Sequence, residues 1–152
     1  MKEKAYFNWS SGKDSALALY LALDSGRFDV KALLTTVNRE TEHIPMHEVP
    51  VGLLYRQAEC IGVPLTVVSF DVNASLDGYQ AAMQKAMDSF RKQEIGTALF
   101  GDIYLEGVRQ RREKHLSGSG IKARFPLWGM PPREVLRAFI GAGFSAIVTC
   151  VD

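Results

Sequence analysis

The stretch Asn8–Ser15 (Asn-Trp-Ser-Ser-Gly-Lys-Asp-Ser) joins two segments with opposite structural preferences. Before it, Ala5–Phe7 is a short apolar run of the kind found in buried strands. After it, residues 16–23 are almost all alanine and leucine, which favour a helix. The stretch therefore predicts a strand, a tight loop of small residues and a helix start. Free backbone N–H groups converge at a helix start and the helix dipole favours negative charge, so we expect this loop to bind a phosphate.

The side chains of the loop strengthen this prediction. Ser10, Ser11 and Ser15 add hydroxyl donors, and Lys13 adds a positive charge. A Walker A loop would have a glycine where Phe7 stands, so the pattern is not of that kind. The string SSGKDS resembles instead the pyrophosphate-binding loop (SGGxDS) of the ATP pyrophosphatase superfamily, whose members cleave ATP between its α and β phosphates. The alternative is an ordinary strand-to-helix turn capped by serine or aspartate.

Composition sets broad limits on the protein class. With 152 residues, 47% hydrophobic and 23% charged, the chain has the size and composition of one soluble globular domain. The net charge of +1 gives no general electrostatic reason to expect nucleic acid or membrane as a partner. Cys60 and Cys150 lack the spacing of metal ligands, and we expect a reduced, cytoplasmic protein.

Predicted strands and helices alternate along the chain. This alternation predicts an α/β domain with a mostly parallel sheet and helices on both of its faces. A further short extended segment is expected at 123–127. The expected strands are 5–7, 28–37, 64–70, 97–100 and 144–151, and the expected helices are 13–25, 50–61, 75–92, 106–116 and 133–142.

Several polar groups fall where predicted strands end, which is where ligands bind in such sheets. Thr36, Val37 and Asn38 end the second strand and could line an adenine pocket, or simply fray into a loop. Gly101-Asp102 ends the fourth strand. Asp102 could hold Mg²⁺ opposite a phosphate or cap the following helix.

Three other candidates stay ambiguous. Asp14 could be related to a metal or could match the helix dipole as a first-turn acid. Met46-His47 precedes the helix expected at 50–61 and could cover a nucleotide, although a histidine at a helix start often simply faces water. The basic run 109–114 is either a solvated helix face or a clamp for phosphates.

A series of short motifs runs through the chain in a fixed order. They are SSGKDS (10–15), Met46-His47, Gln57-Ala58-Glu59, FGDIYLE (100–106), Arg109 with Arg112-Glu113, Pro126-Leu127-Trp128 and GFSAIV (143–148). This series resembles the diphthine–ammonia ligase family of N-type ATP pyrophosphatases, in the adenine nucleotide α-hydrolase-like group. The resemblance implies a Rossmann-like (HUP-type) fold with a five-stranded parallel sheet.

The resemblance also implies an activity with ATP and Mg²⁺ as cofactors. ATP would adenylate a carboxylate and release pyrophosphate, and ammonia would then displace AMP to leave an amide, which is the reaction of an AMP-forming ligase. Lys13, Asp14 and Asp102 would be catalytic, and Asp102 would bind the metal. The nucleotide would be bound by Ser10, Ser11, Gly12, Lys13, Asp14, Ser15, Thr36, Val37, Asn38, Met46, His47 and Gly101.

Two departures from the family pattern keep alternatives open. Family members usually continue into an acidic region linked to the acceptor, which we expect to be absent from this chain, leaving residues 1–152 as one adenine-nucleotide-binding domain. Glu48 also stands where the family often has glycine. The chain could therefore be a non-catalytic ATP/AMP-binding module or a part of a larger ligase, and an RNA-modifying adenylating enzyme is a further alternative. The carboxylate acceptor is not identified, and open sheet edges would allow a homodimer.

Overall fold

A computed structural model describes residues 1–45, 49–71 and 76–148 of the chain. Within them the predicted alternation of strands and helices is confirmed, and no helix there is long and apolar enough to cross a membrane. The elements are β1 (Glu3–Asn8), α1 (Lys13–Asp24), β2 (Phe28–Asn38), α2 (Val51–Ile61), β3 (Leu65–Phe70), α3 (Leu76–Lys92), β4 (Thr97–Leu99), α4 (Glu106–Leu116), β5 (Lys122–Arg124) and α5 (Pro132–Gly141).

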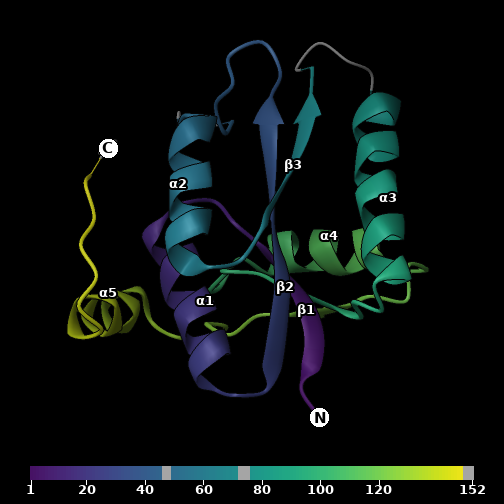
Figure 1. The fold of residues 1–152 in the computed structure, drawn as a ribbon. Helices are drawn as coiled ribbons and strands as arrows, with labels where there is room; N and C mark the ends of the chain where they lie inside the picture. The colour runs from purple at the N-terminus through teal and green to yellow at the C-terminus, as the bar shows by residue number, and fades with distance from the viewer. Residues whose placement is uncertain (46–48, 72–75, 149–152) are drawn as a thin grey trace.

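The five strands form one sheet in the order β3-β2-β1-β4-β5, and every pairing is parallel. Figure 1 shows α2 and α3 on opposite sides of the sheet, so helices cover both faces as predicted. The strand order reverses between β1 and β4. In open parallel sheets a crevice forms at such a switch point, beyond the carboxyl ends of the strands. The loop after β1 and the segment after β4 both lead into it.

Alternate side chains of the central strands enter two separate cores. Ala5 and Phe7 pack in the core beneath α1, α2 and α5, whereas Tyr6, between them, packs beneath α3 and α4. Leu33 and Leu34 of β2 divide in the same way and are 0% and 2% exposed. Burying each of these large side chains stabilises the fold by about 1.5–3 kcal/mol. Continuous apolar strands are therefore required here, because each sheet face has its own core.

The fifth strand differs from the prediction. Residues 144–148, expected to begin the last strand, are irregular, and Ile147 and Val148 are 91% and 75% exposed. Residues 149–151 of that predicted strand lie outside the described part of the chain. The fifth strand is instead β5, at one edge of the sheet, which overlaps the short extended segment expected at 123–127, and its Lys122 N–H donates to the Gly96 carbonyl at 2.9 Å. A short, charged edge strand is favourable because it discourages pairing with other chains.

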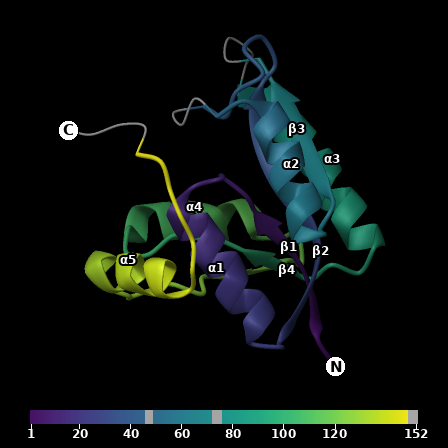
Figure 2. The ribbon, with the colours of Figure 1, turned by 60° about the vertical axis from the view of Figure 1, so that its left-hand side comes forward.

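The segment after α5 runs beside α1. Helix α5 contacts α1, and Figure 2 shows the yellow segment that follows α5 passing across α1 in that view. Aromatic contacts fix it: the Phe144 ring stacks on Phe139 at 5.1 Å and meets Tyr20 edge-on at 5.7 Å between centroids. Phe144 is therefore held by rings of α1 and α5 and does not pair in the sheet, while Ile147 and Val148 stay exposed.

Candidate functional site

The loop after β1 has the backbone conformation of an anion site. Gly12 is the N-cap of α1 and no side chain caps this helix end, so the alternative of a serine or aspartate cap is not what the structure shows. Ser11 has φ +66°, a left-handed conformation that often forms an anion-binding concavity together with its neighbours. The first intrahelical bond runs from Ala16 N–H to the Gly12 carbonyl at 3.0 Å. The N–H groups of residues 13–15 precede this bond, so the helix itself does not use them.

Two serine hydroxyls brace the loop. Ser15 is only 4% exposed; its Oγ accepts from the Ser10 N–H at 3.2 Å and donates to the Asn8 carbonyl at 3.4 Å. Ser10 Oγ accepts from the Gly12 N–H at 3.4 Å. These bonds tie the end of β1 to the start of α1, so the loop is preorganised. The Ser15 hydroxyl is therefore used in hydrogen bonds within the loop. Its contact with a phosphate stays a prediction.

Lys13 and Asp14 form an ion pair on the rim of the loop. Lys13 Nζ lies 2.7 Å from Asp14 Oδ1, and the two side chains are 44% and 34% exposed. An ion pair this exposed is weak because water screens it. Breaking this ion pair therefore costs little free energy, so the Lys13 side chain could contact a bound phosphate. Asp14 is close enough to orient Lys13, and its relation to a metal stays a prediction.

Gly101 and Asp102 lie directly against the loop. A Cβ atom on Gly101 would be 3.1 Å from Ser15 N and Cα, so the end of β4 and the start of α1 meet backbone to backbone. Asp102 is not a helix cap, since the N-cap of α4 is Leu105. The structure thus brings the predicted loop and the predicted metal ligand together at the switch point.

One carboxylate oxygen of Asp102 is buried and has no hydrogen bond among the described residues. This oxygen is Oδ2, and Arg112 Nε lies 3.4 Å away from it as an ion-pair partner. A buried carboxylate oxygen without a hydrogen bond suits Mg²⁺, which binds one or two carboxylates and shares its remaining positions with phosphate and water. No cluster of three or more acidic, histidine or cysteine ligands occurs among the described residues.

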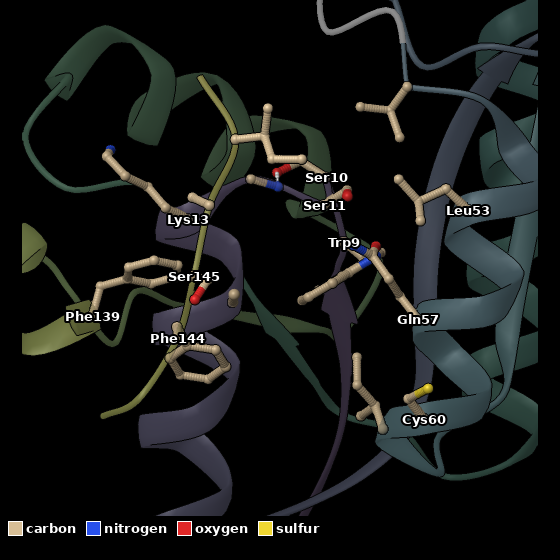
Figure 3. A pocket seen from close by; sticks show the side chains of 16 residues that line it. Trp9, Ser10, Ser11, Lys13, Leu53, Gln57, Cys60, Phe139, Phe144 and Ser145 are labelled. Carbon is tan, nitrogen blue, oxygen red and sulfur yellow. Dashed lines mark hydrogen bonds between the residues drawn. The ribbon is translucent and has the colours of Figure 1, made fainter. Parts of the chain in front are cut away.

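A pocket of about 560 Å³, here called the loop pocket, opens beside residues 10–13. Figure 3 shows Leu53 and Gln57 of α2 on one side of it and Phe139 and Phe144 on the other. Trp9 lies between them, and its Nε1 donates to Gln57 Oε1 at 3.0 Å. Sequence reasoning did not assign these residues to the site. The helical spacing of Leu53 and Gln57, four residues apart, was the available signal.

The three predicted site residues at the end of β2 are not brought to this pocket. Thr36, Val37 and Asn38 end β2 and pair with β3, and none of them lines the loop pocket. Val37 is buried, and Asn38 Oδ1 accepts from the Glu40 N–H at 2.9 Å as part of a local turn. Met46 and His47 lie outside the described residues.

Comparison with known proteins follows this geometry. Residues 2–123 match the family described as "Diphthamide synthase N-terminal domain". The chain belongs to this family. No curated protein matches the sequence.

Two solved structures share the fold. One is described as a predicted subunit of tRNA methyltransferase from Methanocaldococcus jannaschii; it is 16% identical with a TM-score of 0.56, over 90% of this chain and 75% of that chain. The other is the U34-tRNA thiolase NcsA from Methanococcus maripaludis with its [4Fe-4S] cluster. It is 15% identical with a TM-score of 0.54, over 95% of this chain and 60% of that chain. At these identities the likeness shows the fold alone.

Membership of the diphthamide synthase N-terminal domain family implies an enzyme of the ATP pyrophosphatase type and suggests that it uses ATP. The matched residues contain the whole of the loop and Asp102. They leave out Phe139 and Phe144, which form one wall of the loop pocket. The loop and Asp102 therefore lie within the matched family domain, whereas part of the apolar wall of the loop pocket lies beyond the matched residues.

Proposed function

We propose that this protein adenylates a carboxylate with ATP, releases pyrophosphate, and transfers the acyl group to ammonia, as a diphthine–ammonia ligase does. The observation that carries the proposal is the meeting of the SSGKDS loop and Asp102 across Gly101 at the switch point. A phosphate on the loop would lie within reach of a carboxylate suited to Mg²⁺. Among the described residues of this site, no side chain has the arrangement of a nucleophile beside a base, and this reaction requires none, since the substrate carboxylate attacks.

The proposed chemistry balances in two steps. A carboxylate oxygen of the acceptor bonds to the α-phosphorus of ATP, and the bond from that phosphorus to the bridging oxygen breaks, so pyrophosphate leaves with the electron pair. Ammonia nitrogen then bonds to the acyl carbon, AMP leaves with its oxygen, and a proton is lost to water. Each step builds negative charge on a phosphate leaving group, which fixed donors would stabilise.

The residues of the loop would share that task. The N–H groups of residues 13–15 would donate to the pyrophosphate, and Lys13 would neutralise its charge. Asp102 would hold Mg²⁺, which when bound supplies positive charge to the phosphate oxygens. The adenosine end remains a prediction at Thr36–Asn38 and Met46-His47. The apolar walls of the loop pocket, with Trp9 and Leu53, offer further surface of the size a nucleoside needs.

Pyrophosphate release tests this proposal. Purified protein is supplied with ATP, Mg²⁺, ammonium and a panel of carboxylates, and each component is omitted in turn. We expect repeated release only when all components are present, with at most one pyrophosphate per enzyme when ammonium alone is omitted. We expect Asp102→Asn to reduce release by about 100-fold because one charge that holds the metal is lost. Release that needs no carboxylate, or full activity of the Asp102 variant, would contradict the proposal. Nucleotide binding without any turnover would favour the alternative of a non-catalytic ATP/AMP-binding module.

A second candidate function is adenylation of RNA. The two solved structures reported above are described as a predicted subunit of tRNA methyltransferase and a tRNA thiolase, and α4 carries the basic run 109–114. Binding of a transfer RNA whose affinity falls steeply with added salt would favour this candidate, because phosphate contacts release counterions. Absence of such binding at low salt would remove it.

A further inference from the structure

A second hollow of about 520 Å³ lies on the opposite face of the sheet from the loop pocket. We call it the α4 pocket, because α4 forms its rim; α3 and the ends of β1 and β4 form its floor. Its volume is that of a small-molecule site. Neither the family match nor the adenylation chemistry assigns a ligand to it.

The floor of the α4 pocket is aromatic and apolar. Tyr6, Met83 and Phe100 are 1%, 7% and 4% exposed, and Tyr79 lies beside Met83 on α3. Burial raises the pKa of both Tyr6 and Tyr79, so their hydroxyl groups stay neutral. A ligand here would rest an apolar or aromatic body on this floor.

The rim of the α4 pocket is cationic. Arg111, Arg112 and His115 of α4 line it, and His115 lies four residues after Arg111 and three after Arg112, so it shares a helix face with each. None of the described residues that line the pocket is acidic. The Arg112 guanidinium lies over the Phe100 ring at 4.9 Å, and the nearby charge of Arg112 works against the rise in the pKa of both tyrosines. Arg111 Nε donates only to the Gly107 carbonyl among the described residues, at 3.2 Å. These groups match a carboxylate, which arginine binds through two parallel hydrogen bonds.

The α4 pocket also adjoins the phosphate site. Asn8 and Phe100 line it, and each is followed directly by a part of that site: the loop after Asn8 and Gly101-Asp102 after Phe100. Arg112 joins the two places, because its Nε lies 3.4 Å from Asp102 Oδ2. A carboxylate held by Arg112 would therefore lie at the side of the pocket nearest to the proposed metal and the phosphates.

We propose that the α4 pocket binds the acceptor, a small carboxylic acid with an apolar or aromatic body. This inference rests on the proposed adenylating function, since it assigns the carboxylate substrate of that reaction to a place. The body of the acid lies on Tyr79 and Met83, beside the Phe100 ring that Arg112 covers, and its carboxylate is bound by Arg112 with Arg111 and His115 nearby.

Binding of phenylacetate to the ligand-free enzyme tests the assignment, with phenylacetamide as the uncharged probe of the same shape. Methionine methyl groups labelled with ¹³C report the site by NMR: Met83 lines the α4 pocket, and Met130 packs in the core on the other face of the sheet. We expect phenylacetate to shift the Met83 signal saturably in the millimolar range and to leave Met130 unchanged. We expect phenylacetamide to bind at least about tenfold more weakly, because a charge-assisted bond is lost.

Two arginine variants on the same helix complete the test. Arg112→Gln is expected to weaken phenylacetate about tenfold or more. Arg109→Gln removes the same charge, but Arg109 stacks on Trp128 at 4.8 Å and pairs with Glu113 at 3.0 Å, so it should leave the affinity unchanged. Equal effects of the two variants, equal binding of the two probes, or no shift of Met83 would overturn the assignment.

The assignment and the proposed function fail in different ways. Wild-type protein that releases pyrophosphate from ATP but does not bind phenylacetate at Met83 would reject the α4 pocket alone. Protein that binds phenylacetate as expected but does not bind ATP, measured by calorimetry, would reject the adenylating function and leave a carboxylate-binding pocket.

Discussion

The loop pocket and the α4 pocket lie on opposite faces of one sheet and have similar volumes, yet they are built from different groups. The part of the loop pocket that residues 10–13 form consists of small residues, with Lys13 as its cation. The α4 pocket consists of large side chains, with Arg111, Arg112 and His115 over an aromatic floor. Backbone groups can bind a phosphate common to every nucleotide, whereas side chains distinguish one organic acid from another. We infer that a protein that keeps the residues of the loop keeps ATP as its substrate, whereas substitutions in the α4 pocket change which acid it binds as the acceptor.

The largest effect on activity is expected at Lys13, which lines the loop pocket and not the α4 pocket. Lys13→Ala should lower pyrophosphate release by about 100-fold or more, because the charge on the leaving group loses its partner. Lys31→Ala is the matched control, since Lys31 forms an equally short pair with Asp29 at 2.7 Å and is 45% exposed. Steady-state release measured for both variants decides the point. A similar loss of pyrophosphate release in the two variants would show that Lys13 contributes only to the overall positive charge of the protein.

The next effect is expected at Gly101, the point where the two regions meet. Gly101→Ala places a Cβ 3.1 Å from the backbone of Ser15, and this contact cannot be relieved by turning a side chain. We expect a loss of about 1–3 kcal/mol in the free energy of unfolding, together with weaker ATP binding. Gly96→Ala, at the other end of β4, has nothing within 4 Å of its new Cβ and is the control. Urea unfolding that shows equal stability for both variants would mean that the loop and β4 are not in close contact.

A smaller effect is expected at Ser11, whose φ of +66° is unfavourable for any residue with a side chain. Ser11→Gly should keep or slightly raise stability, whereas Ser11→Val should lower it by about 1–2 kcal/mol because a β-branched residue fits this conformation poorly. Urea unfolding and ATP calorimetry on both variants check this. Equal stability of the two variants would show that the loop does not hold Ser11 in the left-handed region.

The smallest effect is expected at Tyr6, on the floor of the α4 pocket. Its hydroxyl donates to Met87 Sδ at 3.3 Å, so Tyr6→Phe should cost about 1 kcal/mol and leave ATP binding unchanged. Burial raises the pKa of Tyr6 above its ordinary value of 10.0. The contribution of Tyr6 to stability is therefore complete below pH 10.0 and is lost as the pH rises further, when the unfolded chain ionises first.

Urea unfolding across this alkaline range separates the two forms. Wild-type protein should lose stability more steeply than Tyr6→Phe above that pH, and Tyr55→Phe, at an exposed tyrosine, is the control. Parallel curves for wild type and Tyr6→Phe would show that Tyr6 is not buried as the structure describes.

The sequence predicted the parts of the molecule that depend on local pattern. The strand, loop and helix around Ser10–Ser15 follow from an apolar run, small residues and an alanine- and leucine-rich segment, and the structure shows all three. The fifth strand was misplaced because the apolar run 144–148 is typical of a strand, whereas in the structure Phe144 packs against helices and Ile147 and Val148 are exposed. The sequence predicted a short extended segment at 123–127, but β5 has three residues, two of them charged, which did not mark it as a strand of the sheet.

The contacts between distant side chains could not be predicted in the same way. Arg109 and Arg112 share a helix face by their spacing, but Arg109 lies over Trp128 and Arg112 beside Asp102. Likewise, nothing in the sequence indicates that Trp9 bonds to Gln57 across the loop pocket. Such contacts depend on how the elements pack, which the pattern within each element does not determine.

The identity of the nucleotide product tests the central claim most directly. The wild-type protein is incubated with ATP, Mg²⁺, ammonium and aromatic carboxylates, and the nucleotides are separated by anion-exchange chromatography. If the SSGKDS loop retains the β and γ phosphates while the α-phosphorus is attacked, AMP and pyrophosphate form in equal amounts. Formation of ADP and inorganic phosphate, or recovery of unchanged ATP, would contradict the account.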